Sequence, residues 1–129
     1  MYKREQVSVV IQATHNSMIF PGKSMVKIAG KTVLEHIVAR IKKVKLVSEI
    51  ILATSDTQED NILVNEALRL HIKVARGSKS DVVSRLCKAV ADAAGKTIVK
   101  VNGNCPLFDP FLANDLINEH LNGDFEFSN

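Results

Sequence analysis

Aromatic residues, cysteine and proline are scarce in this chain of 129 residues, which has no tryptophan, one tyrosine, two cysteines and three prolines. The phenylalanines are scattered, so the sequence offers no aromatic platform on which single-stranded nucleic acid could stack. No apolar run approaches the roughly 18 residues of a membrane span. The apolar run that begins at Val7 is shorter than the core of a signal peptide. We therefore expect no nucleic-acid partner and no membrane association.

Net charge is also small, because 17 Lys and Arg residues face 14 Asp and Glu residues and leave +3. This charge is dispersed, which argues against binding to DNA or to a membrane surface. Cys87 and Cys105 are too far apart in sequence to form a close metal pair, and we expect both to be reduced thiols in a cytoplasmic protein. Apolar residues make up 46% of the chain, which is typical of one globular domain over residues 1–129.

Strand-like and helix-like segments alternate along the chain. Short apolar or β-branched runs typical of buried strands occupy residues 7–12, 49–54, 72–75, 97–101 and, at the end, 124–127. Apolar residues at helical spacing lie between them, over residues 34–41, 63–70, 80–95 and 110–122. The alternation predicts an α/β fold with a mostly parallel sheet covered by helices.

Several polar residues stand where helix caps are expected. Thr32 precedes the first helix and Glu35 follows three residues later, in the arrangement of a capping box. Asp56 and Asp109 precede the second and fourth helices, and capping is a more common role for such aspartates than catalysis. These residues are therefore interpreted as structural.

The third helix has an apolar side that we expect to face the sheet, formed by Val82, Val83, Leu86, Val90 and Ala93. Cys87 lies beside Leu86, so the sequence predicts a small buried residue there. A turn is predicted at residues 76–78, and Gly95 is expected to end the helix.

Ligands of open parallel sheets bind outside the carboxyl ends of the strands. Three loops are expected at that edge, at residues 13–23, 54–56 and 102–106. In the first loop, Ser17, Gly22 and Lys23 could hold a phosphate through backbone N–H groups and one ammonium. The loop lacks the spacing of a Walker motif, so composition alone leaves a plain surface loop as the alternative.

Seven short motifs follow one another in a set order: Val-Ile-Gln-Ala, Pro-Gly-Lys, Ala-Gly-Lys, Leu-Glu-His, Ala-Thr-Ser-Asp, Arg-Gly-Ser-x-x-Asp-Val and Gly-x-Cys-Pro-Leu-x-Asp-Pro. This order resembles the cytidylyltransferase family, in particular the branch named for spore coat polysaccharide biosynthesis protein F. It is also similar to the enzymes that activate acylneuraminate and 3-deoxy-manno-octulosonate with CTP. The resemblance runs from about Val7 to Asn129 and is carried by the whole ordered set.

The resemblance implies a three-layer nucleotide-sugar-transferase Rossmann-like fold, of which this chain is the N-terminal portion, incomplete at its C-terminus. It implies transfer of CMP from CTP to a sugar acid or polysaccharide precursor in cell-surface polysaccharide biosynthesis. Mg²⁺ is the implied cofactor, CTP and a sugar acid are the implied substrates, and a homodimer is the assembly that the family suggests.

The resemblance also assigns residues. Gln12 and Ala13 stand where the family begins its nucleotide-binding loop, and Ser17 and Lys23 match the serine and the phosphate-facing lysine of that loop. Lys23 is the residue that we expect to act in catalysis, and Gly22 precedes it. Asp81 matches a segment that borders the base and ribose.

The chain departs from the family pattern at three places that matter for catalysis. The family loop usually reads Gln-Ala-Arg-x-Gly-Ser-x-Arg-Leu-Pro-Gly-Lys, but Thr14 and Ile19 replace its two arginines. Asn104 stands where the resemblance implies a metal-binding aspartate. Arginines and Mg²⁺ neutralise the triphosphate during transfer, and an amide brings no charge to hold the metal. We therefore expect weak or lost activity.

His15 could supply a cation when protonated, although an exposed polar side chain is the more common role of such a residue. Two alternatives to an enzyme stay open. One is a non-catalytic nucleotide-binding or partner-binding module of the same fold. The other is a receiver-like signalling domain, which ranks last because residues 12–14 and 76–77 supply none of the required acidic residues.

Overall fold

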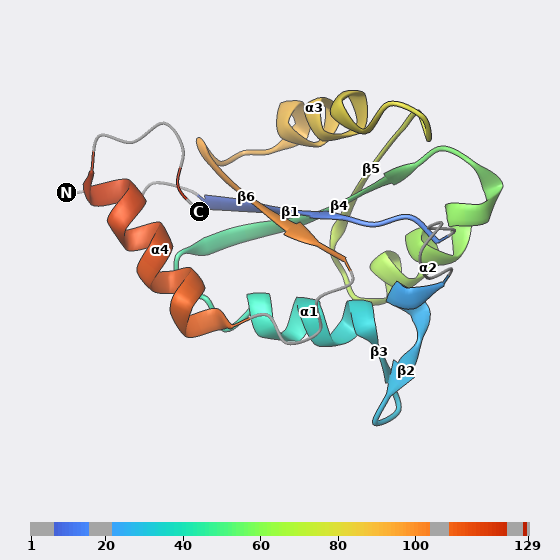
Figure 1. Ribbon diagram of the computed structural model, residues 1–129, viewed down its shortest axis with the longest axis horizontal. Coiled ribbons are helices and arrows are strands. Elements are labelled where there is room, and N and C mark those ends of the chain that lie inside the picture. Colours follow the sequence, from blue (N-terminus) through green and yellow to red (C-terminus); the bar gives the residue numbers. More distant parts are fainter. Residues whose placement is uncertain (1–6, 16–21, 104–108, 124–127, 129) are drawn as a thin grey trace.

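A sheet of four parallel strands forms the centre of the protein, in the order β5-β4-β1-β6. The computed structural model describes residues 7–15, 22–103, 109–123 and 128 (Figure 1). The strands are β1 (Val7–Gln12), β4 (Val47–Ser55), β5 (Lys73–Gly77) and β6 (Thr97–Asn102). Every strand pair in this sheet is parallel, as the alternating sequence predicts.

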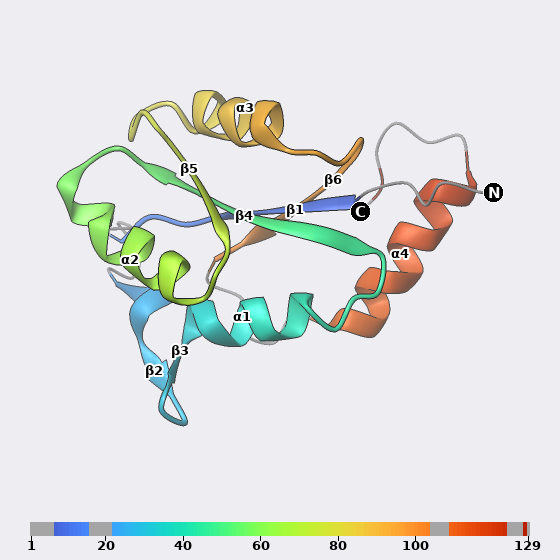
Figure 2. The ribbon, with the colours of Figure 1, turned by 180° about the vertical axis from the view of Figure 1, so that it is seen from behind.

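Helices cover both faces of the sheet and complete three layers. The helices are α1 (Val33–Ile41), α2 (Asn61–Arg69), α3 (Val82–Asp92) and α4 (Pro110–Asn122). Figures 1 and 2 show α1 and α2 on one face and α3 on the other, whereas α4 lies toward the end where β1 begins. The predicted α/β fold with helices over a parallel sheet is confirmed.

Side chains of β1 alternate between two buried clusters, because successive residues of a strand point to opposite faces. Val9 and Ile11 belong to the cluster under α1 and α2. Val10 belongs to the cluster under α3, together with Ala53, Ala75 and Ala89. A third cluster joins α4 to the start of the sheet through Val7, Val44 and Ile117. Burial on both faces explains why residues 7–12 are mostly apolar and do not alternate with polar residues.

Two of the predicted caps form. The Thr32 hydroxyl accepts from the Glu35 N–H at 3.1 Å, and the Asp109 carboxylate accepts from the N–H groups of Phe111 and Leu112 at 2.9 and 3.2 Å. The predicted cap at Asp56 is wrong, because a 3₁₀ turn, η2 (Gln58–Asp60), precedes α2 and leaves Asp56 exposed.

The predicted inner side of α3 is wrong in part. Leu86 and Ala93 pack on the sheet, but Val82, Val83 and Val90 are exposed, and Cys87 is exposed too. The fully buried positions are Arg85 and Ala89, which lie one helical turn apart. The apolar residues of α3 therefore do not mark the side that faces the sheet. One of the two buried positions on that side is an arginine, which a search for apolar residues does not find.

Strand β5 is also longer than predicted at its C-terminal end. Arg76 and Gly77 pair with Thr54 and Ser55 of β4, where the sequence predicts a turn. Pairing with β4 therefore extends β5 beyond the residue at which local turn signals predict its end. The end of α3 also differs from the prediction, because Ala93 and not Gly95 is its C-cap.

A short hairpin of β2 (Lys27–Ile28) and β3 (Lys31–Thr32) was not predicted. It follows a 3₁₀ turn, η1 (Lys23–Met25), and reverses at Ala29 and Gly30, which both have positive φ. The strand predicted at 124–127 lies outside the described residues. Within the described part of the chain, no helix is long and apolar enough to cross a membrane.

Candidate functional site at the carboxyl edge of the sheet

The segments that leave β1 and β6 meet at the carboxyl edge of the sheet. The Gly103 N–H donates to the Gln12 carbonyl at 2.8 Å, which continues the pairing of the two strands beyond their ends. The Ser24 hydroxyl, from η1, donates to the Gly103 carbonyl at 2.5 Å and is buried. These two hydrogen bonds connect the start of the predicted loop at 13–23, the start of the predicted loop at 102–106, and η1. No motif in the sequence indicated Ser24 as a site residue.

Gly103 is required at this junction because there is no room for a side chain. A Cβ at this position would lie 2.6 Å from the Ala13 Cβ and 3.1 Å from the Gln12 carbonyl oxygen. Ala13 in turn donates its N–H to the Ala53 carbonyl at 3.2 Å. The close approach fixes the backbone of Gln12 and Ala13, the two residues that open the predicted nucleotide-binding loop.

Gly22 and Lys23 close the far end of that loop. Gly22 has φ +72°, in the left-handed region that favours glycine, and its N–H donates to the His15 carbonyl. The His15 ring packs so near that a Cβ on Gly22 would lie 3.3 Å from the ring. Lys23 begins η1 and is exposed. Ser17, the third predicted phosphate contact of this loop, lies outside the described residues.

Asp60 is a buried carboxylate beneath this loop that the sequence analysis missed. Its two oxygens accept from the His15 N–H at 2.7 Å, from the Thr54 hydroxyl at 3.0 Å and from the Ser55 N–H at 3.1 Å and hydroxyl. Asp60 therefore connects the end of β4 to the loop after β1. The sequence signal was weak, because Asp60 directly follows Glu59 in a polar segment with nothing to mark one of them as buried.

These hydrogen bonds set the charge of Asp60. Burial alone would raise its pKa, but the bonds from Ser55, from the His15 backbone and from Thr54 outweigh burial and lower the pKa below the ordinary value of 3.8. Asp60 is therefore an anion whose oxygens are filled by protein donors. Its chemistry is that of a positioning residue, since it holds the loop backbone in place.

The remaining predicted residues are less informative. Asp81 is the N-cap of α3, and its carboxylate accepts from the Ser84 N–H at 3.0 Å. Asn104, at the degenerate metal position, lies outside the described residues. No group of three or more His, Cys, Asp or Glu side chains in the described ranges could hold a metal ion.

Buried polar atoms without a partner concentrate at this edge. Among the described residues they are Gln12 Oε1, His15 Nδ1, Arg85 Nε and Nη1, and Asn114 Oδ1. Gln12 and His15 border the loop after β1, and Arg85 packs against the end of β5. His15 is thus half-buried, which corrects the prediction of an exposed polar side chain. The sequence did not indicate Arg85 as a site residue at all.

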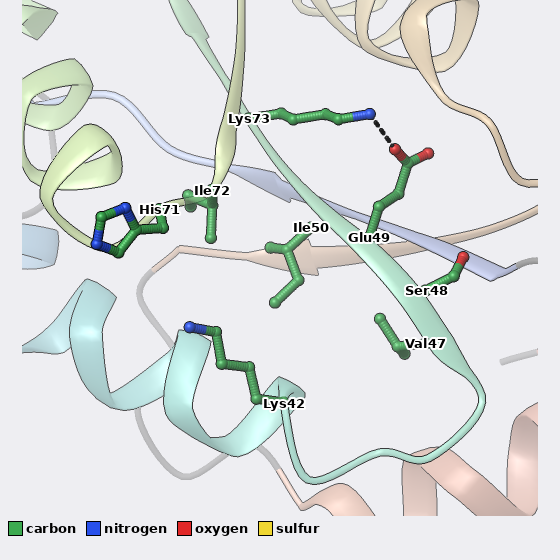
Figure 3. Close-up of a pocket in the computed structure, with 8 residues that line it drawn as sticks. All are labelled: Lys42, Val47, Ser48, Glu49, Ile50, His71, Ile72 and Lys73. Carbon is green, nitrogen blue, oxygen red and sulfur yellow. Dashed lines mark hydrogen bonds and ion pairs between the residues drawn. The ribbon is translucent and has the colours of Figure 1, made fainter.

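The opposite edge of the sheet carries a cavity of about 340 Å³ (Figure 3). Its lining residues are Lys42, Val47, Ser48, Glu49, Ile50, His71, Ile72 and Lys73. The Glu49 carboxylate accepts from Lys73 Nζ at 2.7 Å, from the Ser8 hydroxyl and from the Ala94 N–H. Burial would raise its pKa, but these bonds and the Lys73 charge lower it to about 2. Glu49 is thus saturated by structural partners, and the cavity lies away from the predicted ligand loops.

The fold is a Rossmann-like α/β domain, and the loops after β1 and β6 meet at its carboxyl edge, where open parallel sheets bind ligands. Comparison with known proteins narrows this class. The model of the cytidylyltransferase family matches residues 8–129, and the chain belongs to that family.

Individual relatives agree with this placement. A 3-deoxy-manno-octulosonate cytidylyltransferase of Geobacter metallireducens is 31% identical over 87% of this chain and 43% of its own. The spore coat polysaccharide biosynthesis protein SpsF of Bacillus subtilis is 28% identical over 87% of this chain and 48% of its own. A solved cytidylyltransferase from Leptospira borgpetersenii superposes with a TM-score of 0.86 at 26% identity, over 92% of this chain and 50% of that one. The chain thus spans about half the length of the curated relatives that it matches.

Proposed function

We propose that this chain binds CTP at the carboxyl edge of its sheet and represents the nucleotide-binding portion of an enzyme that transfers CMP to a sugar acid or polysaccharide precursor. The observation that carries the proposal is the junction of Gln12, Ser24 and Gly103, which brings the two family loops together at that edge. The activity would serve cell-surface polysaccharide biosynthesis in the cytoplasm. The departures at Thr14, Ile19 and Asn104 predict weak or absent turnover.

In this proposal the loop after β1 holds the triphosphate. Lys23 supplies the cation, with Ser17 and the backbone of Ala13 and Gly22 as donors. Gln12 and Asp81 lie on the nucleoside side. The left-handed conformation of Gly22 and the close approach of Gly103 support the assignment, because both bring backbone rather than side chains toward the ligand edge.

Mg²⁺, when bound with the nucleotide, would neutralise charge on the triphosphate. The described residues offer weak support for a protein-held ion, since they contain no cluster of ligands, and the predicted metal position carries Asn104. We therefore propose that Mg²⁺ arrives bound to CTP and receives little help from this chain. A sugar acid as the acceptor and a homodimer as the assembly are part of the same proposal.

The second candidate is a module that binds nucleotide without turnover. The absence of both loop arginines favours it, because each charge-assisted hydrogen bond contributes roughly 1.5–3 kcal/mol. Calorimetric titration of the chain with CTP, with and without Mg²⁺, separates the candidates. Tight, Mg²⁺-dependent binding of CTP supports the enzyme, and weak, Mg²⁺-independent binding supports the module. No CTP binding under either condition contradicts both.

Lys23→Ala tests the site directly. We expect CTP affinity to be abolished while the melting temperature stays nearly unchanged, because Lys23 is exposed and its charge acts on the ligand. Lys31→Ala, in the exposed hairpin, is the matched control and should bind CTP normally. Unchanged CTP affinity in Lys23→Ala would remove the site assignment.

Restoring the family pattern tests the loss of activity. The triple variant Thr14→Arg, Ile19→Arg and Asn104→Asp should bind CTP more tightly in the presence of Mg²⁺, since it regains two cations and one metal-binding carboxylate. No gain in Mg²⁺-dependent affinity would mean that these positions do not explain the weakness of the site.

A further inference from the structure

The cavity at the amino edge of the sheet has no role in the proposed function. Its volume of about 340 Å³ lies within the usual range for small-molecule sites, roughly 300–1,000 Å³. It is bordered by the end of α1, the first residues of β4 and β5, and the turn between α2 and β5 (Figure 3). A cavity of this size has room for an organic molecule.

Three basic side chains from three different parts of the chain line this cavity. Lys42 is the C-cap of α1, His71 lies in the turn after α2, and Lys73 begins β5. Figure 3 shows the Lys42 ammonium directed toward the part of the cavity that His71 and Ile72 border, while Lys73 extends toward Glu49. The fold therefore collects positive charge that is scattered in the sequence.

The acidic group of the lining does not balance this charge. Among the described lining residues Glu49 is the one acid, and its carboxylate already accepts from Lys73, from the Ser8 hydroxyl and from the Ala94 N–H. Lys73 uses one of the three N–H donors of its ammonium in this contact. Within the described residues, the side chains of Lys42 and His71 have no hydrogen-bond or ion-pair partner. The cavity therefore offers donors and positive charge.

His71 holds a backbone position that favours glycine. Its φ is +59°, and its N–H donates to the Leu68 carbonyl at 3.1 Å. The Ile72 N–H donates to the Ala67 carbonyl at 3.1 Å, so the turn is the Schellman arrangement that ends α2. A residue with a side chain is strained in this conformation. Strain of this kind concentrates at functional sites, so the imidazole at the cavity wall needs a reason beyond the turn itself.

The helix ends give a second reason for cations at this edge. Lys42 and His71 follow the last turns of α1 and α2, where positive charge complements the helix dipole. That role needs no ligand, and it predicts that both side chains affect stability alone. It explains neither the strained backbone of His71 nor the cavity beside these side chains, and the experiment below separates the two roles.

The lining residues select the class of ligand. A cation finds no free carboxylate, because the oxygens of Glu49 are filled. Lysine binds phosphate as a point charge, whereas planar carboxylates are matched by the paired donors of arginine, which does not line the cavity. Donors on separate elements suit a tetrahedral group with several oxygens. The apolar lining residues Val47, Ile50 and Ile72 offer contact to a carbon body.

We propose that this cavity binds a small organic phosphate. Its phosphate group accepts from Lys42, His71 and Lys73, and its carbon body lies against Ile50 and Ile72. The site lies at the opposite edge of the sheet from the proposed nucleotide site and uses none of the residues assigned there. The inference therefore stands or fails independently of CTP binding.

The test is an NMR titration of the ¹⁵N-labelled chain at pH 7 and constant ionic strength. The probes are glycerol 3-phosphate, inorganic phosphate and, as the uncharged counterpart, glycerol. Both phosphates should give saturable shifts of the amides of residues 47–50 and 71–73 and of the His71 ring, and glycerol should give none. Lys42→Gln and His71→Gly should each weaken glycerol 3-phosphate binding about threefold to tenfold. His71→Gly should keep its melting temperature, because glycine suits φ +59°.

Lys45→Gln is the matched control, because it removes an exposed lysine near the end of α1 that does not line the cavity. It should leave the affinity unchanged, and an equal loss in this variant overturns the inference in favour of attraction by overall charge. Unchanged affinity in Lys42→Gln and His71→Gly assigns both side chains to the helix ends and also overturns it. Shifts confined to residues 12–13 and 22–24 place the phosphate at the proposed nucleotide site and overturn this inference alone.

Discussion

The two ends of the four-stranded sheet differ in how completely their buried polar groups are hydrogen-bonded. At the amino edge, Glu49 is saturated by Lys73, Ser8 and the Ala94 N–H. At the carboxyl edge, Gln12, His15 and Arg85 keep buried polar atoms that have no partner among the described residues. Asn114 Oδ1, on α4 near the amino edge, is also without a partner, so the contrast is between four unfilled buried atoms at the carboxyl edge and one near the amino edge among the described residues. The edge with more unfilled atoms is the one where open parallel sheets bind ligands.

Asp60 is an exception at the carboxyl edge. Its carboxylate oxygens accept hydrogen bonds from protein donors, as those of Glu49 do at the amino edge. Its partners are the backbone and hydroxyls that shape the ligand loop, so it acts as scaffold for its unsatisfied neighbours. The comparison therefore separates groups that build the edge from groups that keep unfilled polar atoms there.

The largest effect is expected for Asp60→Ala, the substitution that breaks the scaffold at the carboxyl edge. It leaves several buried donors without an acceptor, which should lower the free energy of unfolding by about 3–5 kcal/mol. Urea unfolding monitored by circular dichroism measures the loss. Asp56→Ala, four residues earlier and exposed, should change stability by about 0.5 kcal/mol or less. Similar losses in both variants would contradict the role assigned to Asp60.

A smaller effect is expected for Gly103→Ala, which adds a methyl group at the junction of the two family loops. The new Cβ would lie 2.6 Å from the Ala13 Cβ, so the backbone must shift. Overpacking of this kind destabilises by about 1–3 kcal/mol, and CTP affinity should fall because Ala13 moves. Gly30→Ala has no atom within 4 Å of its new Cβ and serves as the comparison, with strain from φ +80° alone. Full stability of Gly103→Ala would show that the junction can relax.

Glu49→Gln tests the saturated amino edge through its pH dependence. The pKa of Glu49 in the folded protein, about 2, lies below the ordinary value of 4.5, so the stabilisation by Glu49 is present above about pH 4.5 and is lost as the pH falls toward 2. We expect Glu49→Gln to lower the free energy of unfolding by about 1–2 kcal/mol at pH 7. This figure includes a reduction for solvent screening, because Lys73 is largely exposed. Denaturant titrations from pH 7 to 2 should show the two proteins converging. A pH-independent gap would exclude a charge effect.

The smallest effect is expected for Glu59→Gln, which weakens a Lys–Glu pair at the carboxyl edge. Lys79 Nζ lies 3.0 Å from Glu59, but both side chains are about half exposed, so solvent screens the pair. The loss should be below about 0.5 kcal/mol at pH 7. A loss of stability as large as that of Glu49→Gln would contradict the expectation that the exposed Glu59 contributes less than the largely buried Glu49.

Local patterns predicted much of the fold. The parallel strands, four helices and caps at Thr32 and Asp109 follow from alternation of apolar runs and from single side chains that bond their own backbone. The failures have different causes. Strand β5 is longer than predicted because it pairs with β4, which is distant in sequence. Asp56 does not cap α2 because a 3₁₀ turn intervenes, and Cys87 faces outward because Arg85 and Ala89 of the same helix face the sheet.

The sequence by itself determined the family, the layer architecture and the two loops on which the proposed site depends, because these are written in short contiguous motifs. Only the tertiary structure decided which polar groups are filled and which are not. Glu49 and Arg85 lie within strand and helix patterns and Asp60 lies in a polar segment, and nothing nearby in sequence marks any of the three as buried. Their roles differ because Ser8, His15 and Gly77, up to 45 residues away, reach them or leave them unpaired.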